Sequence, residues 1–355
     1  MYDYVIVGGG PAGATLGRLI NKKYKVLILE KRTFEDKFES PSQKCCGGLL
    51  APDAQKMLAK FGLGIPNSVL QSPQLFAVRT IDINNSVEKY YQRHYINIDR
   101  QKFDRWLLSL VSSNVEIKTG CIFKKYEKKD NELVINYTQD GKSYSLRTKY
   151  LIGADGANSM IRRKAFKYKP MPQKYISIQD WFATNDEHSY YGAIFDEEIT
   201  DFYSWIIPKQ EYLIIGSALK DDSKAIQKFE LLKQKLIKYG FNLENKVKRN
   251  GAFIMRPKKL NQICLGEENI ILVGEAAGFI SPSSAEGISY AFRSAMELAQ
   301  AIELRAENVL SNYEKRANLL KMNIICKNLK SPAMYQSTIR KTIMKSGIMS
   351  IKLHK

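Results

Sequence analysis

The sequence predicts a mixed α/β protein in which a domain with a parallel sheet is interrupted by an antiparallel-sheet domain. Two short β-branched runs, residues 3–7 and 25–29, flank a helical pattern at about 13–23, and this order is typical of parallel strand pairing. Residues 172–256 are strand-rich, with one amphipathic helix at about 223–238. A buried-type strand at 269–273 and a helix from about 286 to 305 return the chain to the first domain.

The remaining elements set the domain boundaries. Residues 41–63 contain prolines, small residues and a short helix-like stretch, which we interpret as an active-site loop and helix. Two strands, a helix and an antiparallel meander are expected next, at 75–82, 87–95, 101–112, 121–128, 132–138 and 143–148. The sequence therefore predicts a discontinuous first domain (1–70, 97–170 and 257–330), an inserted domain (71–96 and 171–256) and a basic C-terminal helix or tail (331–355).

Length and composition exclude several classes of protein. A chain of 355 residues, 44% hydrophobic and 26% charged, suits two globular domains. No apolar run of about 18 residues occurs, and Met1 leads directly into a strand, so we expect a cytoplasmic protein. The formal charge of +19 comes without a nucleic-acid-reading motif, so we expect no nucleic acid partner. Five cysteines without repeated spacing predict neither a disulfide framework nor a metal site.

A glycine-rich turn follows the first strand. Gly8, Gly10 and Gly13 fit the GxGxxG pattern between a strand and a helix, and Glu30 ends the next strand. Such glycines let a pyrophosphate approach the amides of a helix N-terminus, and the acid accepts from ribose hydroxyls. The sequence therefore predicts a Rossmann-like dinucleotide site, in which we place Gly8, Gly10, Pro11, Ala12, Gly13, Glu30, Lys31 and Arg32. This motif alone does not separate FAD from NAD.

Two further motifs carry a resemblance. Residues 153–159, Gly-Ala-Asp-Gly-Ala-Asn-Ser, resemble the Asp-Gly motif of the aromatic-hydroxylase superfamily of FAD enzymes. Residues 274–278, Gly-Glu-Ala-Ala-Gly, resemble its Gly-Asp-Ala-Ala-Gly segment over the ribityl chain, with Glu275 in place of the aspartate. The resemblance implies FAD, an antiparallel-sheet substrate domain as in group A flavoprotein monooxygenases, and flavin contacts from Asp155, Gly156, Gly274, Glu275 and Gly278.

Within that superfamily, three local features resemble the geranylgeranyl reductase family, including its CbrA-like branch. Residues 44–49 resemble its Cys-Gly-Gly loop beside the isoalloxazine, residues 203–209 its Tyr-x-Trp-x-Phe-Pro box, and residues 281–288 its Ser-Pro-x-x-x-Glu-Gly-Ile segment. The likeness spans residue 1 to about 300. Ile207 replaces the usual Phe of the box, and flavin-dependent halogenases carry a related box, but Tyr203 stands in place of their first tryptophan. The resemblance implies reduction of carbon–carbon double bonds in a hydrophobic, isoprenoid-like substrate.

Reduced flavin chemistry suggests roles for the residues around the ring. The helix that follows Gly287 and Ile288 is expected to direct its N-terminal amides at the flavin N1–O2 edge, where negative charge collects on reduction. Cys46, next to Gly47 at the ring, is our candidate proton donor, with Cys45 as a second candidate. The equal alternative is that both cysteines are small packing residues.

Other candidate residues lie further along the chain. Arg100 resembles the family arginine that approaches the FAD phosphates or ribose, and an ordinary surface arginine is the alternative. Tyr203, Trp205 and Pro208 are expected to line the substrate cavity, where aromatic faces suit an apolar chain, or to belong to the core of the sheet.

The sequence leaves the reaction and the electron donor open. No second GxGxxG is visible, so electrons would come from transient NAD(P)H or from a protein donor such as reduced ferredoxin. The alternatives to a reductase are an FAD monooxygenase that uses NAD(P)H and O2, and a flavin-binding redox or resistance protein without turnover. The basic tail is either an interfacial helix at the inner face of the membrane or a helix that caps the substrate domain.

Overall fold

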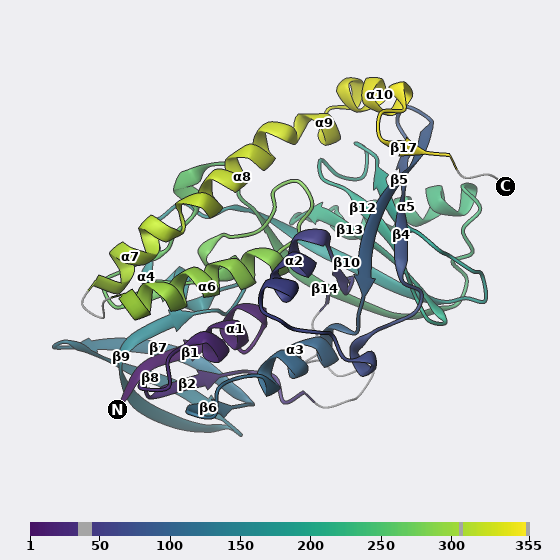
Figure 1. Cartoon of the computed structure of the whole chain (residues 1–355). Helices are drawn as coiled ribbons and strands as arrows, with labels where there is room; N and C mark the ends of the chain where they lie inside the picture. The colour runs from purple at the N-terminus through teal and green to yellow at the C-terminus, as the bar shows by residue number, and fades with distance from the viewer. Residues whose placement is uncertain (35–44, 305–307, 353–355) are drawn as a thin grey trace. The chain divides into compact units, whose positions relative to one another are not determined.

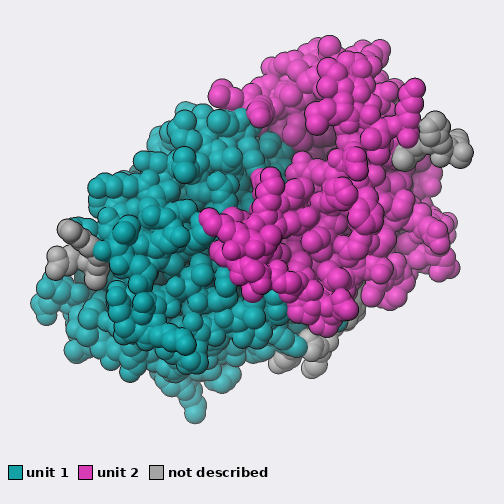
Figure 2. All heavy atoms as spheres, in the orientation of Figure 1, with its two compact units in different colours: residues 1–43, 101–173, 255–327 teal, residues 44–100, 174–254, 328–355 magenta. Residues whose placement is uncertain are grey.

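The computed structural model describes residues 1–34, 45–304 and 308–352 (Figure 1). The chain divides into two compact units of three segments each (Figure 2). Unit 1 contains residues 1–43, 101–173 and 255–327, and unit 2 contains residues 44–100, 174–254 and 328–355. Neither unit is a continuous piece of sequence, because the chain passes from one unit to the other five times. None of the helices in the described ranges has the length and apolarity that a membrane crossing requires.

Unit 1 is built on a sheet with the strand order β15-β16-β9-β1-β2-β6, and β7 and β8 extend it as an antiparallel ribbon from β9. Its strands are β1 Tyr2–Val7, β2 Val26–Leu29, β6 Val115–Lys118, β7 Cys121–Lys129, β8 Glu132–Gln139, β9 Lys142–Gly153, β15 Gly266–Glu267 and β16 Ile270–Leu272. Its helices are α1 Pro11–Leu19, α3 Arg100–Ser109, α4 Met160–Ala165, α6 Ile288–Leu304, α7 Val309–Arg316 and α8 Asn318–Lys330. The first residue of α3 and the last three residues of α8 fall in unit 2.

The central strands of unit 1 are apolar where they pair in parallel, because both faces of the sheet are covered there. Ile6, Ile28, Ile152 and Ile271 are completely buried, and β1 pairs in parallel with both β2 and β9. Continuous apolar runs of this kind are typical of buried parallel strands. The strand–helix–strand prediction for the first thirty residues is thereby confirmed, although α1 begins at Pro11 and ends at Leu19.

Strand β9 joins two regions that the sequence suggested were separate. Its first half pairs antiparallel with β8, and its second half, from Thr148 to Gly153, pairs in parallel with β1. The expected strand at 143–148 and the following apolar run are therefore one strand. The apolar pattern changes within it because residues 142–147 are mostly exposed, whereas Leu151 and Ile152 are buried.

Unit 2 contains a sheet with the order β14-β10-β13-β12-β11-β4-β5-β17, in which the β11–β4 pair is parallel and the pairs from β10 to β11 are antiparallel. Its strands are β3 Leu49–Leu50, β4 Leu75–Asp82, β5 Val87–Asn97, β10 Gln173–Ala183, β11 Tyr191–Phe195, β12 Ser204–Lys209, β13 Tyr212–Lys220, β14 Lys246–Arg256 and β17 Ser350–Ile351. Its helices are α2 Pro52–Lys60, α5 Ala225–Lys238, α9 Pro332–Tyr335 and α10 Ser337–Ser346. Phe229, Leu232 and Leu236 of α5 are fully buried in a cluster with aliphatic residues of the sheet.

One segment lies in a different unit from the one we expected. Residues 45–70 belong to unit 2 because β3 pairs with β5 and Leu70 forms a bridge with Ile98, so their backbone hydrogen bonds go to that sheet. The C-terminal segment, for which we predicted a helix or tail assigned to neither domain, belongs to unit 2, where β17 pairs with β5. In addition, the helix expected from residue 286 begins at Ile288, because Ala285 has a φ of +52°, outside the helical region.

Candidate functional site

Three glycine-containing turns meet at one edge of the unit 1 sheet. Val7 is in register with Gly153, and Gly153 is in register with Leu272, so β1, β9 and β16 end side by side. The turns that follow these strands carry the three motifs singled out in the sequence. In open α/β sheets, ligands bind at the carboxyl ends of parallel strands. The fold therefore brings the three motifs to one candidate site.

The first turn has two glycines that packing requires and one that it does not. Gly8 has a φ of +108°, and a Cβ there would lie 2.4 Å from the Ala154 carbonyl oxygen. A Cβ on Gly13 would lie 1.9 Å from the Gly8 carbonyl oxygen. At Gly10, by contrast, a Cβ would meet nothing within 4 Å, and no side chain caps the start of α1. Open space thus faces a helix N-terminus, whose amides favour an anion.

Glu30 is buried and holds the turn in place. Its Oε2 accepts from the Gly9 amide at 2.6 Å and from Arg32 Nη2 at 3.1 Å, while its Oε1 accepts from Arg32 N and Nε at 2.9 and 3.0 Å. Arg32 also donates to Asp104 Oδ2 at 2.7 Å. Burial opposes ionisation of Glu30, but the Arg32 guanidinium lowers the pKa of the carboxyl overall. A ribose hydroxyl would replace one of the Arg32 bonds, since a carboxylate has about four acceptor positions. Lys31 is exposed.

The second turn presents a carboxylate with spare capacity. Asp155 Oδ2 accepts from the Met160 and Ile161 amides at the start of α4, at 2.7 and 3.3 Å. Its Oδ1 is buried and accepts no hydrogen bond from the described part of the chain. Burial raises the pKa of this carboxyl, although the α4 amides favour the charged form. Gly156 has a φ of +76°, and a Cβ there would meet nothing within 4 Å.

The third turn contacts the first one. A Cβ on Gly274 would lie 3.1 Å from that of Ala12, and the Gly274 amide donates to Ser294 Oγ of α6 at 2.9 Å. Gly278 has a φ of +93°. Glu275, which replaces the usual aspartate, accepts from the Met255 amide at 3.1 Å through Oε1. The longer side chain therefore has a backbone partner.

Further along, Gly287 precedes the first turn of α6, and its carbonyl accepts from the Ala291 amide at 2.9 Å. Ile288 is the first residue of that helix. The expected amide-bearing helix N-terminus is therefore present, two residues later than the sequence indicated.

These features fit FAD. The uncapped start of α1 and the open space at Gly10 suit a diphosphate, and the unsatisfied Asp155 Oδ1 suits a hydroxyl donor. In unit 1 the residues that would hold FAD are those predicted in the three turns, together with Glu30 and Arg32.

Unit 2 contains the Cys-Gly-Gly loop, of which Lys44 lies outside the described residues. Cys46 Sγ accepts from Arg100 Nη1 at 3.4 Å and from the Gly48 amide at 3.4 Å. Cys45 is 9% exposed, and its thiol donates to Gln179 Oε1 at 3.3 Å. Arg100 thus lies beside the Cys46 thiol, a contact that the sequence did not suggest.

A buried lysine lies beneath this loop. Lys209 is 3% exposed, and its Nζ donates to the Gly48 carbonyl at 3.1 Å, to the Ile98 carbonyl at 2.7 Å and to Asn97 Oδ1. Among the described residues, no carboxylate lies within ion-pair distance of Lys209. Burial lowers the pKa of Lys209 to about 7, against attraction to Cys46 and Asp99. The Tyr-x-Trp box therefore ends in a residue that fastens the cysteine loop.

The same packing explains the two glycines of the loop. A Cβ on Gly47 would lie 2.4 Å from Ile207 Cδ1. Gly48 has a φ of +63°, and a Cβ there would lie 2.4 Å from the Ile98 carbonyl and 2.6 Å from Lys209 Nζ. Gly48 is therefore required by its backbone conformation and by the Ile98 carbonyl, whereas a side chain at position 47 would displace the end of the Ile207 side chain.

The three predicted substrate-lining residues lie in β12 or just before it. Tyr203 and Trp205 are 9% and 6% exposed, with ring centroids 5.6 Å apart, and Pro208 is also buried. Trp205 lies over Gly216, where a Cβ would be 2.2 Å from the indole nitrogen. That nitrogen has no hydrogen-bond partner among the described residues. These contacts are those of a sheet core, the second of the two interpretations of the sequence.

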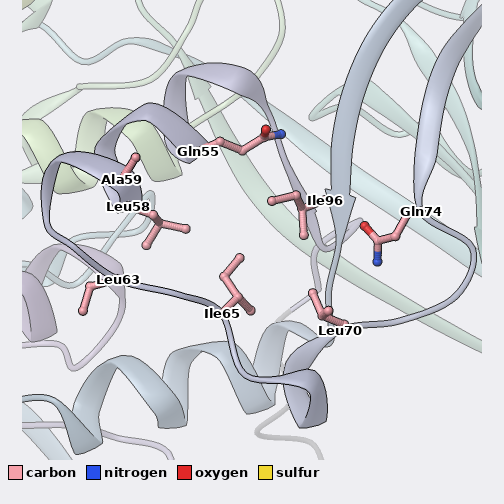
Figure 3. A pocket seen from close by; sticks show the side chains of 8 residues that line it. All are labelled: Gln55, Leu58, Ala59, Leu63, Ile65, Leu70, Gln74 and Ile96. Atoms are coloured by element: carbon pink, nitrogen blue, oxygen red, sulfur yellow. The ribbon is translucent and has the colours of Figure 1, made fainter.

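An apolar cavity of about 420 Å³ lies elsewhere in unit 2, between α2, the loop that follows it and β5 (Figure 3). Its lining is aliphatic apart from two glutamines: Gln55, Leu58, Ala59, Leu63, Ile65, Leu70, Gln74 and Ile96. Gln55 Nε2 donates to the Leu50 and His94 carbonyls, and Gln74 Nε2 donates to the Gln71 and Asn97 carbonyls. Both amides are bound to backbone, so the cavity offers mainly hydrocarbon to a ligand. None of the predicted lining residues belongs to it.

Two cationic side chains, Lys209 and Arg162, stand within or next to the sequence motifs but were given no role there. Lys209 ends the Tyr-x-Trp box, and a lysine inside an otherwise buried strand was the available signal. Arg162 is 1% exposed and donates to the carbonyls of Ala276, Pro170 and Gln262 at 3.2, 3.0 and 2.7 Å. It thereby ties the second turn to the third.

Comparison with known proteins places this geometry in a family. Residues 1–185 match the family described as FAD binding domain. Protein CbrA of Escherichia coli O6:H1 (strain CFT073) is 38% identical over 354 residues, which cover 99% of this chain and 94% of that protein. A geranylgeranyl bacteriochlorophyll reductase-like protein from Thermoplasma acidophilum has a similar structure, with a TM-score of 0.80 at 19% identity over 97% of this chain and 90% of that one.

A third similar protein carries a different description. PqsL of Pseudomonas aeruginosa, described as a probable FAD-dependent monooxygenase, has a TM-score of 0.70 at 16% identity over 98% of this chain and 99% of that one. At such identities the two structures show the fold alone, and they confirm the predicted mixed α/β FAD-binding architecture. The chain belongs to the FAD-binding-domain family, as a homologue of CbrA within the FAD-dependent oxidoreductase superfamily.

Proposed function

We propose that this FAD-dependent oxidoreductase reduces carbon–carbon double bonds in a hydrophobic, isoprenoid-like substrate. The observation that carries the proposal is the Cys46 thiol, held 3.4 Å from the Arg100 guanidinium in a loop fastened by a buried lysine. Saturating a double bond requires a hydride at one carbon and a proton at the other. When bound in its reduced form, FAD supplies hydride chemistry, and the protein has to supply the proton.

The surroundings of Cys46 favour proton release at Sγ. Arg100 Nη1 and the Gly48 amide both point donors at the sulfur, and a nearby cation stabilises the thiolate that remains after the proton has left. Cys45 has a different environment, since its own thiol donates to the side-chain oxygen of Gln179. Cys46 is therefore the proposed donor, and Cys45 is a matched control in the adjacent position.

The cavity shown in Figure 3 supports an apolar substrate. This open hollow is lined mainly by aliphatic side chains, and its two amide side chains are already bound to backbone carbonyls. The isoprenoid class comes from the description of the Thermoplasma acidophilum protein. For the electron donor we propose NAD(P)H, bound transiently, or reduced ferredoxin.

A monooxygenase is the second candidate, because PqsL shares the fold along nearly the whole chain. The two reactions differ in their need for oxygen. The test incubates the FAD-loaded protein with geranylgeraniol and dithionite without oxygen, and then with NADPH in air. Product mass is measured in both cases. We expect a product heavier by two hydrogens under anaerobic conditions.

Variants of the two cysteines complete the test. Cys46→Ser is expected to lower this anaerobic activity about 100-fold or more, in line with the loss of a general acid, and Cys45→Ser is expected to retain most of it. FAD content, read from the flavin absorbance, should be unchanged in both. A product heavier by one oxygen, formed only in air, would make the protein a monooxygenase. FAD binding without either product would favour the non-catalytic alternative.

A further inference from the structure

The C-terminal segment of unit 2 is firmly attached to the sheet. Arg340 of α10 is 3% exposed and donates to both carboxylate oxygens of Asp82, at 2.7 and 3.2 Å. Tyr335 packs on the rings of Phe195 and Phe202, with centroids 5.9 and 5.4 Å apart. After α10, β17 pairs with β5, and Figure 1 shows α10 and β17 beside this strand. Residues between these attachments are therefore held in a defined conformation.

Between α10 and β17 the chain presents two large apolar side chains to solvent. Ile348 is 65% exposed and Met349 is 86% exposed, and we call this pair the tail tip. Gly347 ends α10 in the left-handed conformation, and the Ser350 amide and hydroxyl both donate to its carbonyl, at 3.0 and 2.7 Å. Met349 itself has a φ of +60°, an uncommon conformation for a side chain of its kind. The turn therefore fixes the exposure of both side chains.

The surroundings of the tail tip are apolar and basic. Ile339 and Ile343, one turn apart on α10, are 39% and 38% exposed. Lys341, Lys345 and Lys352 are also exposed. At about 100° per residue, the two α10 lysines and the two isoleucines flank the buried Arg340 on opposite sides of the helix. The sequence contains no Asp or Glu after Glu314. Aliphatic side chains interspersed with lysines, without acids, complement the surface of a bilayer that contains anionic lipids.

We propose that the tail tip, together with the exposed isoleucines and lysines of α10, docks on an anionic lipid bilayer. Ile348 and Met349 enter the boundary between headgroups and acyl chains, while the three lysines pair with lipid phosphates. The proposal does not depend on the reaction catalysed. It does require an intact tail, because removing residues 331–355 would leave Asp82 buried without Arg340, and point variants are therefore the right test.

The experiment measures flotation of the full-length, FAD-loaded protein with phosphatidylcholine vesicles that contain or lack phosphatidylglycerol. We expect binding to the anionic vesicles, weakened by high salt because exposed charges are screened. The double variant Ile348→Asp, Met349→Asp is expected to bind at least about tenfold more weakly. Lys341→Gln and Lys345→Gln are each expected to weaken binding about fivefold.

Two control variants make the same kinds of substitution at exposed positions away from the C-terminal segment. Ile226→Asp changes an isoleucine that is 60% exposed on α5, and Lys224→Gln changes an exposed lysine next to it. Both should bind vesicles like the unaltered protein, and all variants should retain FAD. Failure of the unaltered protein to float, or equal flotation of the tail-tip variant, would overturn the proposal. So would a dimer that only the tail-tip variant loses in sedimentation without vesicles, because a second copy would then cover this surface.

Discussion

Lys209 is the residue whose charge state matters most to the cysteine loop. As an ammonium it has three N–H donors, which match its three oxygen acceptors at Gly48, Ile98 and Asn97. As a neutral amine it has only two, so one of these oxygens loses its donor. The Gly48 carbonyl then competes with the Ile98 carbonyl and Asn97 Oδ1 for the two remaining N–H donors. The position of the Cys46 loop is therefore expected to depend on pH near neutrality.

Replacing Lys209 by methionine tests this electrostatic account. Burial lowers the pKa of Lys209 to about 7 in the folded protein, from an ordinary value of 10.5. Between those values the unfolded chain binds more protons, so stability should rise with pH by up to about 1.4 kcal/mol per unit. In Lys209→Met this contribution is absent. Urea unfolding at several pH values from neutral to alkaline measures the slope, with the exposed Lys220→Met as control. Parallel slopes in all three proteins would show that the lysine does not titrate there.

At the scale of elements, the sequence predicted the structures formed by residues close together in the chain, but not the contacts between residues far apart in it. The GxGxxG turn is encoded largely by neighbours in the chain, because Gly8 needs its positive φ and Gly13 packs against the Gly8 carbonyl within the same strand–turn–helix. The contacts that organise both candidate sites join residues far apart: 72 residues separate Arg32 from Asp104, and 161 separate Lys209 from Gly48. No periodicity or motif specifies such pairs. The placement of residues 45–70 was missed for the same reason, since it depends on pairing with β5.

The attachment of α10 is one of these distant contacts, with 258 residues between Arg340 and Asp82. Arg340→Met should destabilise unit 2, because it leaves the Asp82 carboxylate buried without its cation. Breaking a buried ion pair on one side typically costs about 3–5 kcal/mol. The free energy of urea unfolding measures the effect, and the exposed neighbour Lys341→Met should change it by less than about 0.5 kcal/mol. A loss below about 1 kcal/mol for Arg340→Met would mean that α10 is held mainly by its other contacts.

At the scale of the whole molecule, we expect the two units to unfold together, because neither is a continuous piece of sequence and the chain passes five times between them. A ligand that binds only the folded chain therefore raises the unfolding midpoint of the whole protein. With FAD at about 100 times its dissociation constant, the gain is about 2.7 kcal/mol. This gain reports on binding without requiring knowledge of the substrate or the reaction.

The variant Gly10→Ala is expected to weaken FAD binding without changing the stability of the FAD-free protein. A Cβ at Gly10 would meet no atom within 4 Å, and its φ of −75° suits alanine, so the stability of the FAD-free protein should change by less than about 0.5 kcal/mol. The added methyl group would enter the space where we place the diphosphate, and crowding of this kind costs about 1–3 kcal/mol. FAD affinity should fall roughly ten- to hundredfold, and most of the FAD-dependent rise in the midpoint should disappear. Thermal unfolding with and without FAD measures both effects, with Gly64→Ala, also in open space, as the control. If Gly10→Ala retains the full FAD-dependent gain, the diphosphate does not lie at the start of α1.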